Sequence, residues 1–297
     1  MHNPQHGLVQ KQLLTPADIE AVSRLAGVCN AYEQLDMRAD WLDVRPEYFG
    51  NMHDYLYYED DRLVGYLFLR RNGTAQKEVT GIVHPDYRRR GIFSTLLAAA
   101  REECKQQQVQ KLILICEDRS ASGQAFIAAS GARHDFSEHK MILGSFHESY
   151  SFDDRLAVQE ADMSDLDALI TIIADGWGRG THEVRESVTF NLQEPTCDVY
   201  IARFGGDALS CGEPVGCLRA YDFAREIGIY GFVVRPDYRG RGYGRQILEE
   251  VIRAVQSRSQ KPIMLEVDTD NTTALNLYRS CGFEVVRTYE YYAIDVA

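Results

Sequence analysis

The sequence predicts an α+β (α/β) fold in two tandem domains, each a mixed and mostly antiparallel sheet flanked by helices. Three observations lead to this prediction: a chain of 297 residues, a motif that recurs after 151 residues (242 − 91), and one order of strand and helix patterns in both halves. The length suits two domains of about 150 residues each. We therefore expect one domain over residues 1–148 and a second over residues 149–297.

The repeat is clearest in a segment rich in arginine and glycine. His84–Gly91 (HPDYRRRG) recurs as Arg235–Gly242 (RPDYRGRG). Two further glycine pairs keep the same offset: Gly65 with Gly216, and Gly131 with Gly282. A constant offset over such a stretch indicates a duplicated domain. The two copies are expected to join near residues 145–152.

Both halves begin with a helix start signal and a predicted hairpin. Thr15–Asp18 and Ser164–Asp167 have the spacing of a capping box, with Asp in place of the usual Glu. Runs rich in β-branched and aromatic residues follow each helix. They pair as Tyr55–Tyr58 with Leu63–Leu69, and as Val199–Arg203 with Val215–Tyr221.

The C-terminal half continues with alternating strand and helix patterns. The predicted order is the strand Ile227–Val234, a loop and helix, the strand Ile263–Val267, the helix Thr272–Ser280 and the strand Val285–Ile294. The first of these helices has one apolar face at the helical period, formed by Ile247, Leu248, Val251, Ile252 and Val255. An antiparallel start followed by a β-α-β centre gives the α+β class.

Composition narrows the class of protein. With 45% apolar and 26% charged residues the chain reads as an ordinary globular protein. Seven cysteines without a C-x-x-C pair predict free thiols and a cytoplasmic location, with neither a disulfide framework nor a metal site. The N-terminus lacks the pattern of a secretory signal, and no apolar run approaches the length of a membrane span.

The net charge of −12 is unevenly divided between the halves. Residues 1–150 hold 17 Lys and Arg against 20 Asp and Glu, whereas residues 151–297 hold 15 against 24. An acidic C-terminal half disfavours a nucleic-acid partner and attracts a cationic amine. Charge that serves only solubility is the alternative.

A glycine-rich loop, Arg239–Arg245 (RGRGYGR), stands between a predicted strand and a predicted helix. Glycines let the backbone approach a ligand closely, and the unpaired N–H groups at a helix start favour an anion. The loop lacks the lysine of a P-loop, and Arg245 occupies the place of the third glycine of a dinucleotide motif. A pyrophosphate site is therefore one interpretation, and a tight connection with solvated arginines is the other.

This loop resembles the acetyl-CoA motif (Q/R-x-x-G-x-G/A) of the GNAT superfamily of acetyltransferases. Asn271–Phe283 (NTTALNLYRSCGF) resembles the second motif of that superfamily, in the expected order. The resemblance covers residues 156–297 well and residues 8–145 as a degenerate copy, and the tandem arrangement is similar to mycothiol synthase and its relatives. It implies acetyl-CoA as cofactor, with loop N–H groups on the pyrophosphate and a strand edge along the pantetheine arm. The cofactor contacts it implies are Phe232, Val233, Val234, Arg239, Gly240, Arg241, Gly242, Tyr243, Gly244, Arg245 and Asn271.

Two side chains are candidates for proton transfer. By resemblance, Tyr278 stands where the family's tyrosine donates a proton to the CoA sulfur; core packing is the alternative, because it shares a helical face with apolar residues. Glu266 precedes it by 12 residues, a spacing similar to that of ribosomal-protein alanine N-acetyltransferases, and is the expected general base. Glu226 is the rival base, and Gly228 occupies the family's alternative base position.

The N-terminal copy departs from the family pattern. At the offset of 151, Gly244 becomes Phe93, Glu266 becomes Ile115, and Tyr278 becomes Ile127. This copy is therefore expected to be non-catalytic, although Arg88 and Gly91 leave CoA binding open. Four aromatic residues are candidates to line the acceptor cleft, namely Trp177, Tyr289, Tyr291 and Tyr292. For each tyrosine, packing in the core or on an edge strand is the alternative.

Together these features predict direct acetyl transfer from acetyl-CoA to a primary amine. The acceptor alternatives are a peptide α-amine, an aminosugar conjugate or another small amine. A non-catalytic acyl-CoA-binding sensor is the competing class. We expect no nucleic-acid or membrane partner, and a monomer or weak dimer.

Overall fold

The computed structural model describes residues 5–37, 53–72, 75–149, 153–178, 180–205 and 212–296. The chain forms two compact units. Unit 1 comprises residues 1–138 together with 287–297, and unit 2 comprises residues 139–286. The repeat predicted a single boundary at residues 148/149, whereas the two compact units divide the chain at 138/139 and again at 286/287.

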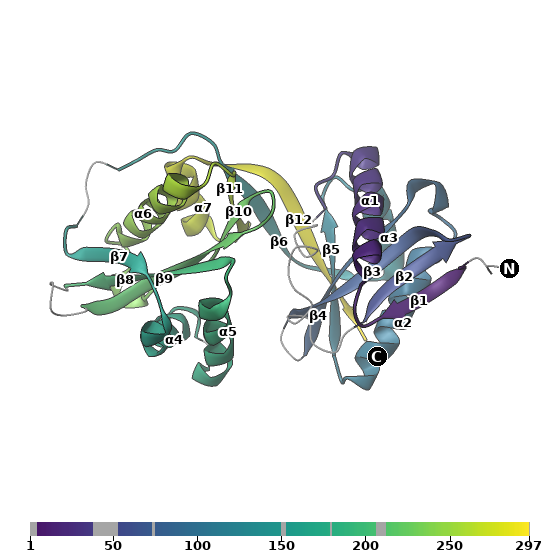
Figure 1. The fold of residues 1–297 in the computed structure, drawn as a ribbon, viewed down its shortest axis with the longest axis horizontal. Helices are drawn as coiled ribbons and strands as arrows, with labels where there is room; N and C mark the ends of the chain where they lie inside the picture. The colour runs from purple at the N-terminus through teal and green to yellow at the C-terminus, as the bar shows by residue number, and fades with distance from the viewer. Residues whose placement is uncertain are drawn as a thin grey trace. The chain divides into compact units, whose positions relative to one another are not determined.

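Unit 1 contains a sheet with the strand order β1-β2-β3-β4-β5-β12 (Figure 1). Its elements are β1 (Gly7–Lys11), α1 (Pro16–Glu33), β2 (Asp54–Glu59), β3 (Arg62–Asn72), β4 (Gln76–Val83), α2 (Ile92–Gln106), β5 (Lys111–Glu117), α3 (Ala121–Ser130) and the start of β6 (Arg133–Leu143). All pairings along β1–β4 are antiparallel, and only β4 and β5 run parallel. Helix α1 packs in one apolar cluster and α2 in another, so each face of the sheet is covered.

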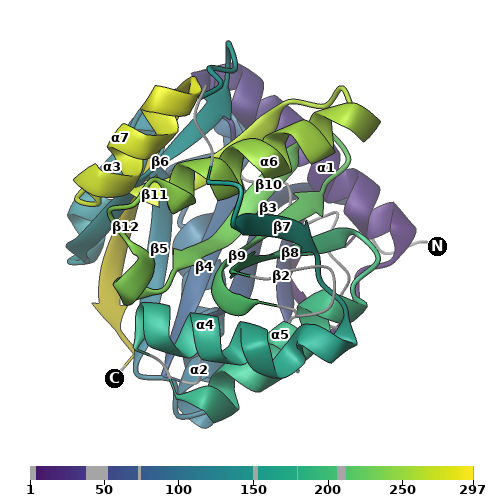
Figure 2. The same cartoon turned by 90° about the vertical axis from the view of Figure 1, so that its left-hand side faces the viewer.

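Unit 2 repeats this plan, with the strand order β6-β11-β10-β9-β8-β7. Its elements are β7 (Leu156–Glu160), α4 (Leu166–Trp177), α5 (Thr181–Gln193), β8 (Cys197–Phe204), β9 (Glu213–Asp222), β10 (Ile227–Val234), α6 (Tyr243–Arg258), β11 (Ile263–Asp268), α7 (Thr272–Cys281) and the start of β12 (Phe283–Asp295). The core against α6 and α7 includes the predicted apolar helix face. Helices α4 and α5 pack in a separate cluster, and Figure 2 shows them on the side of the strands away from α6.

The two units exchange their last strands. β6 begins in unit 1 and ends in unit 2, whereas β12 begins in unit 2 and ends in unit 1. The yellow end of β12 pairs antiparallel with β5 from Tyr289 to Asp295 (Figure 1). Each sheet is therefore completed by the strand that follows the other unit's last helix.

Two helix starts test the predicted capping boxes. Thr15 caps α1 as predicted, since its side chain accepts from Asp18 N and Asp18 accepts from Thr15 N. The second predicted capping box is wrong by two residues. Asp162 and Asp165 form the box there, because a short 3₁₀ turn precedes α4. The fold class itself is confirmed: each sheet is mixed, mostly antiparallel and flanked by helices.

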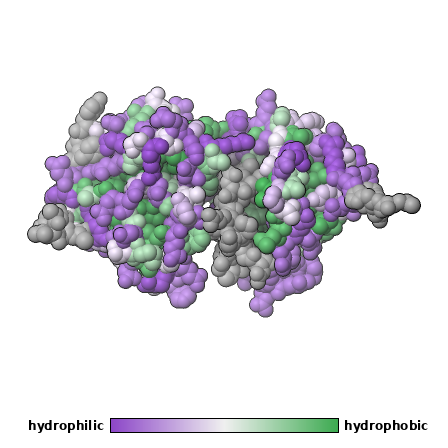
Figure 3. Space-filling view, viewed as in Figure 1, coloured by the Kyte–Doolittle hydropathy of each residue, from purple (hydrophilic) through white to green (hydrophobic). Residues whose placement is uncertain are grey.

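On the face drawn in Figure 3, hydrophobic residues form scattered patches among hydrophilic ones. Within the described residues, no helix is both long and apolar enough to span a membrane. Trp177 is one of the exposed large hydrophobic side chains, with 43% of its surface accessible.

Candidate active site

The centre of unit 2 is a fork between two parallel strands. β10 and β11 pair through Ile227–Ile263, Gly228–Met264 and Ile229–Leu265. Beyond this last pair β10 continues to Val234 and β11 to Asp268. Where parallel strands stop pairing, their facing N–H and C=O groups become available to a ligand. The fork therefore presents backbone groups of β10 and β11 that are not paired with one another.

A β-bulge stands beside the fork. The register of β10 against β9 shifts between Tyr230 and Val233, and Gly231 has a φ of +61°. A bulge adds one residue and moves the alternation of side chains by one. Because Arg235 N donates to Val215 of β9, alternation turns the N–H of Val234 toward the fork. This edge is where the pantetheine contact of Phe232–Val234 was expected.

The predicted glycine loop has the shape that an anion site requires. Gly240 and Gly242 have φ angles of +73° and +84°, and a Cβ at either position would meet no atom within 4 Å. Gly242 is the N-cap of α6 and supplies no side-chain cap. The first N–H groups of α6 are thus left for a ligand, and their dipoles favour a negative charge. The loop fits a pyrophosphate group.

The three predicted arginine contacts differ in their surroundings. Arg239 donates from Nε to the carbonyl of Val234 at 2.8 Å and from a terminal nitrogen to that of Gly176 at 3.1 Å. Arg241 is exposed and stacks over the Tyr238 ring, 5.3 Å from its centroid. Arg239 therefore holds the loop to β10 and α4, and Arg241 is the arginine best placed to add charge at the surface.

Arg245 is bound within unit 2. Its guanidinium contacts Glu249, 2.5 Å away, and the carbonyl oxygens of His147 and Ser280. Glu249 is fully buried and also accepts from Ser149 N. These contacts hold the Arg245 side chain within unit 2, and its contact with the cofactor stays a prediction.

The remaining predicted cofactor residues lie around the start of α6 and α7. Tyr243 is buried and its hydroxyl donates to Asp153, so only its backbone faces the loop. Gly244 lies beside Phe232 and Leu277, with ordinary room for a Cβ. Asn271 caps α7, since its side-chain oxygen accepts from Ala274 N at 3.1 Å. The structure thus brings the two sequence motifs to one side of the fork.

Tyr278 lies on α7, on the face of the sheet that α6 and α7 cover. Its ring packs 6.4 Å from that of Phe232 and 6.0 Å from that of Phe283. Burial raises the pKa of Tyr278 to about 12. The hydroxyl therefore stays protonated at neutral pH, which is the state that a proton donor needs. A packing role and proton donation are compatible for Tyr278, because its ring is in the core and its neighbour Phe232 lies beside the fork.

Glu266 is the first residue of β11 after the last pair with β10. Its neighbours Leu265 and Val267 belong to the core against α6 and α7. Since side chains alternate along a strand, Glu266 points to the face covered by α4 and α5. The two predicted catalytic residues thus approach the fork from opposite faces of the sheet.

The alternative bases are less well placed. Glu226 forms a 2.9 Å ion pair with Lys140 and precedes the paired start of β10. At Gly228, a Cβ would meet the Tyr230 ring at 2.4 Å and the Phe223 ring at 2.9 Å. Aromatic rings fill the space that a carboxylate would need there. Glu266 is the carboxylate that the geometry favours.

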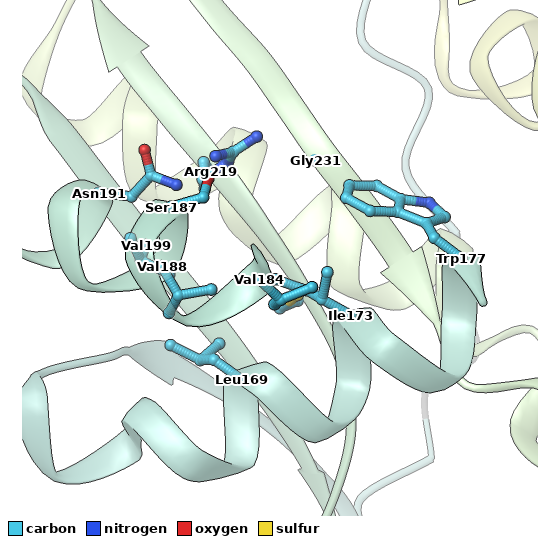
Figure 4. A pocket seen from close by; sticks show the side chains of 11 residues that line it. Leu169, Ile173, Trp177, Val184, Ser187, Val188, Asn191, Val199, Arg219 and Gly231 are labelled. Atoms are coloured by element: carbon cyan, nitrogen blue, oxygen red, sulfur yellow. The ribbon is translucent and has the colours of Figure 1, made fainter. Parts of the chain in front are cut away.

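Three of the four predicted cleft aromatics lie elsewhere. Tyr289, Tyr291 and Tyr292 belong to the part of β12 in unit 1, where they pair with β5. Tyr291 stacks on Phe136 with ring centroids 4.1 Å apart. Of the two expectations for these tyrosines, the structure favours packing over the acceptor cleft, because β12 carries all three into unit 1. Trp177 does line a pocket of unit 2, between α4, α5 and the sheet (Figure 4).

Unit 1 keeps the loop but not the predicted catalytic side chains. Arg89 and Gly91 have φ angles of +64° and +80°, close to those of Gly240 and Gly242. A cavity of about 720 Å³ opens between β4, β5 and the helices. Its wall includes Ile115, Ile127 and Phe93, as the offset of 151 predicts.

Sequence reasoning missed two features of the site. A glycine inside a strand pattern is a signal for a bulge, so Gly231 was detectable. Arg219, which lines the same pocket as Trp177, left no such signal. Among the described residues, no group of His, Cys, Asp and Glu side chains is arranged to hold a metal ion.

Comparisons with known proteins agree with this architecture. A family model described as "Acetyltransferase (GNAT) family" matches residues 21–131 and again residues 166–283. The chain is 36% identical to mycothiol acetyltransferase of Thermobifida fusca over 80 residues, which are 27% of the chain and 21% of that protein. It is 38% identical to a ribosomal-protein alanine N-acetyltransferase of Escherichia coli over 58 residues, which are 20% of the chain and 39% of that protein.

A solved structure shares the whole fold. The tandem GNAT protein from the clavulanic acid biosynthesis pathway superposes with a TM-score of 0.72 and 19% identity, covering 98% of this chain and 99% of that one. The chain spans less than half of the length of the curated relatives it matches. The family model covers both units and most of their length. The chain therefore belongs to the acetyltransferase (GNAT) family.

Proposed function

We propose that this chain is an N-acetyltransferase and that unit 2 carries the reaction. The family takes its acetyl group from acetyl-CoA, which supplies it as a thioester. The observation that carries the proposal is the fork, with Glu266 on one face, Tyr278 on the other and the glycine loop behind. In this arrangement the amine and the acetyl donor reach the fork separately.

The loop and the strand edge hold the donor. N–H groups at the start of α6, with Gly240 and Gly242 leaving room, bind the pyrophosphate. The free edge of Phe232–Val234 pairs with the pantetheine arm and aligns it along the fork. Holding the thioester beside the amine supplies much of the rate enhancement, since it makes the encounter intramolecular.

Two side chains move the protons. Glu266, directly or through one water, accepts a proton from the amine as its nitrogen bonds the acetyl carbon. Tyr278 donates its hydroxyl proton to the sulfur as the carbon–sulfur bond breaks. Each role is general acid–base catalysis, so no covalent bond to the protein is needed.

We propose that unit 1 is non-catalytic. Ile115 and Ile127 offer no proton, and Phe93 crowds the cavity between β4 and α3. Its loop shape leaves acyl-CoA binding without turnover open to test.

The six described cysteines are free and buried, which supports a reducing compartment such as the cytoplasm. A monomer or weak dimer stays our proposal for the assembly.

The deciding experiment measures thiol release from acetyl-CoA with a panel of amines: α-amines of short peptides, aminosugars, amino acids and simple alkylamines. Amine-dependent release that Tyr278→Phe abolishes supports the proposal. Tight acetyl-CoA binding without release by any amine would instead support an acyl-CoA sensor.

A further inference from the structure

The pocket lined by Trp177 lies on the face of unit 2 where Glu266 points. It has a volume of about 120 Å³ and is enclosed by α4, α5 and strands β8–β10. Figure 4 shows the indole of Trp177 at one end and polar side chains at the other. Aliphatic side chains from both helices also line the pocket, namely Leu169, Ile173, Val184 and Val188.

Arg219 supplies the charge of this pocket. Its guanidinium lies over the bulge, since a Cβ on Gly231 would come within 2.7 Å of its Nε. Arg219 on β9 pairs across the sheet with Tyr230 of β10. Tyr230 is the first residue of β10 beyond its last pair with β11, Ile229–Leu265. The positive charge therefore lies beside the start of the fork, where the proposed function places the acetyl group.

Within the described part of the chain, Arg219 has no ion-pair partner. Its guanidinium carbon lies over the Tyr221 ring, 6.0 Å from the ring centroid. Other half-buried arginines of unit 2 are neutralised: Arg203 by Asp165 at 2.6 Å, and Arg235 by Asp175 at 3.1 Å. A partly buried charge without a counter-ion is costly unless a ligand provides one.

From this geometry we infer that the pocket selects an acceptor amine that carries a carboxylate and a compact apolar group, in the manner of an α-amino acid. The inference rests on the proposed function. The planar guanidinium of Arg219 binds the carboxylate through two parallel N–H donors. The aliphatic wall takes the apolar group, and the amine is left directed at Glu266 and the fork.

Volume and charge narrow the class further. A cavity of about 150 Å³ accommodates benzene, so a pocket of about 120 Å³ suits a branched aliphatic group or a small ring. Arg219 repels an acceptor with a second positive charge. The net negative charge of the C-terminal half thus does not by itself define the acceptor, because Arg219 places a positive charge in the pocket.

The test uses three acceptors that differ only at one end: L-leucine, L-leucinamide and isoamylamine. Steady-state thiol release is measured for the wild type and for Arg219→Gln. We expect kcat/KM for L-leucine to fall about 10- to 100-fold, the range for losing a charged hydrogen-bonded partner. For leucinamide and isoamylamine, which carry no carboxylate, it should change less than about 3-fold, and Arg219→Lys should restore part of the loss with leucine.

Comparing each acceptor with itself across variants removes the differences in amine basicity. Arg185→Gln on α5, which breaks an exposed ion pair with Asp167, is the matched control and should leave all three rates unchanged. Calorimetry with L-leucine and coenzyme A gives a second readout that needs no turnover. Equal losses for all three acceptors in Arg219→Gln, or no leucine binding to the wild type, would overturn the inference.

The proposed function has its own readout. If acetyl-CoA binds and another amine is acetylated while leucine is ignored, the enzyme stands and the acceptor class is wrong. If acetyl-CoA does not bind at all, the proposed function itself fails.

Discussion

Phe93 and Gly244 occupy the same position of the repeat, and they leave different space between strand and helix. The Phe93 ring packs edge to face on Phe126, 4.6 Å between centroids, and lies 2.7 Å from where a Cβ of Gly81 would be. Gly244 leaves the space beside Phe232 and Leu277 open. The position beside the loop thus holds an aromatic ring in unit 1 and a glycine in unit 2.

Gly244→Phe should therefore weaken acetyl-CoA binding, because its ring would enter the groove that Phe93 fills in unit 1. We expect a loss of about 2–4 kcal/mol, corresponding to one or two displaced charge-assisted hydrogen bonds. Calorimetry on the folded variant measures it. Gly244→Ala is the size control and should bind nearly normally, since a Cβ there meets its nearest atom at 3.6 Å. Unchanged affinity in Gly244→Phe would remove the loop from the cofactor site.

Tyr278→Phe should lower kcat by roughly 10²- to 10⁴-fold, the range for losing a positioned acid. Acetyl-CoA affinity should change little, because the ring and its packing remain. Tyr292→Phe, which removes a hydroxyl from unit 1, is the matched control. Since burial raises the pKa of Tyr278 to about 12, its ionisation should produce no alkaline limb below about pH 10. A kcat loss of tenfold or less would return Tyr278 to a packing role.

Glu266→Gln should reduce kcat less than Tyr278→Phe and should alter the acidic limb of the pH–rate profile. The reason is that the amide keeps the shape of the side chain but cannot accept the proton. Glu226→Gln breaks the ion pair with Lys140 and should leave that limb as it is. Profiles measured side by side distinguish the two carboxylates, and the opposite pattern would make Glu226 the base.

Glu249→Leu tests the structural role of Arg245. The variant leaves Arg245 and Arg253 without their buried partner, so the free energy of unfolding should fall by about 3–5 kcal/mol. Urea titration measures this, with the exposed Glu186→Gln as control. A variant of normal stability that binds acetyl-CoA poorly would instead place Arg245 at the cofactor.

The repeat made much of the fold and of the site predictable. Glycine spacing anticipated the backbone of the loop, where Gly240 and Gly242 adopt positive φ angles that other residues rarely take. The partner of a strand is a non-local property that periodicity does not encode. The sequence therefore left the acceptor cleft and core packing both open for Tyr291, which lies buried in unit 1. Arg219 went unnoticed for a related reason, because a lone arginine between core residues has no local pattern.

The most direct test of the central claim, that unit 2 alone is catalytic, compares two equivalent arginines. Arg88 and Arg239 make the same contact, since each donates from Nε to the carbonyl five residues earlier, Val83 at 3.1 Å and Val234 at 2.8 Å. Each alanine variant therefore loosens one loop in the same way. We would measure kcat/KM for acetyl-CoA in Arg88→Ala and Arg239→Ala after circular dichroism shows that both are folded. The account predicts a loss of about tenfold or more in Arg239→Ala and near-normal turnover in Arg88→Ala; turnover abolished in Arg88→Ala and retained in Arg239→Ala would contradict it.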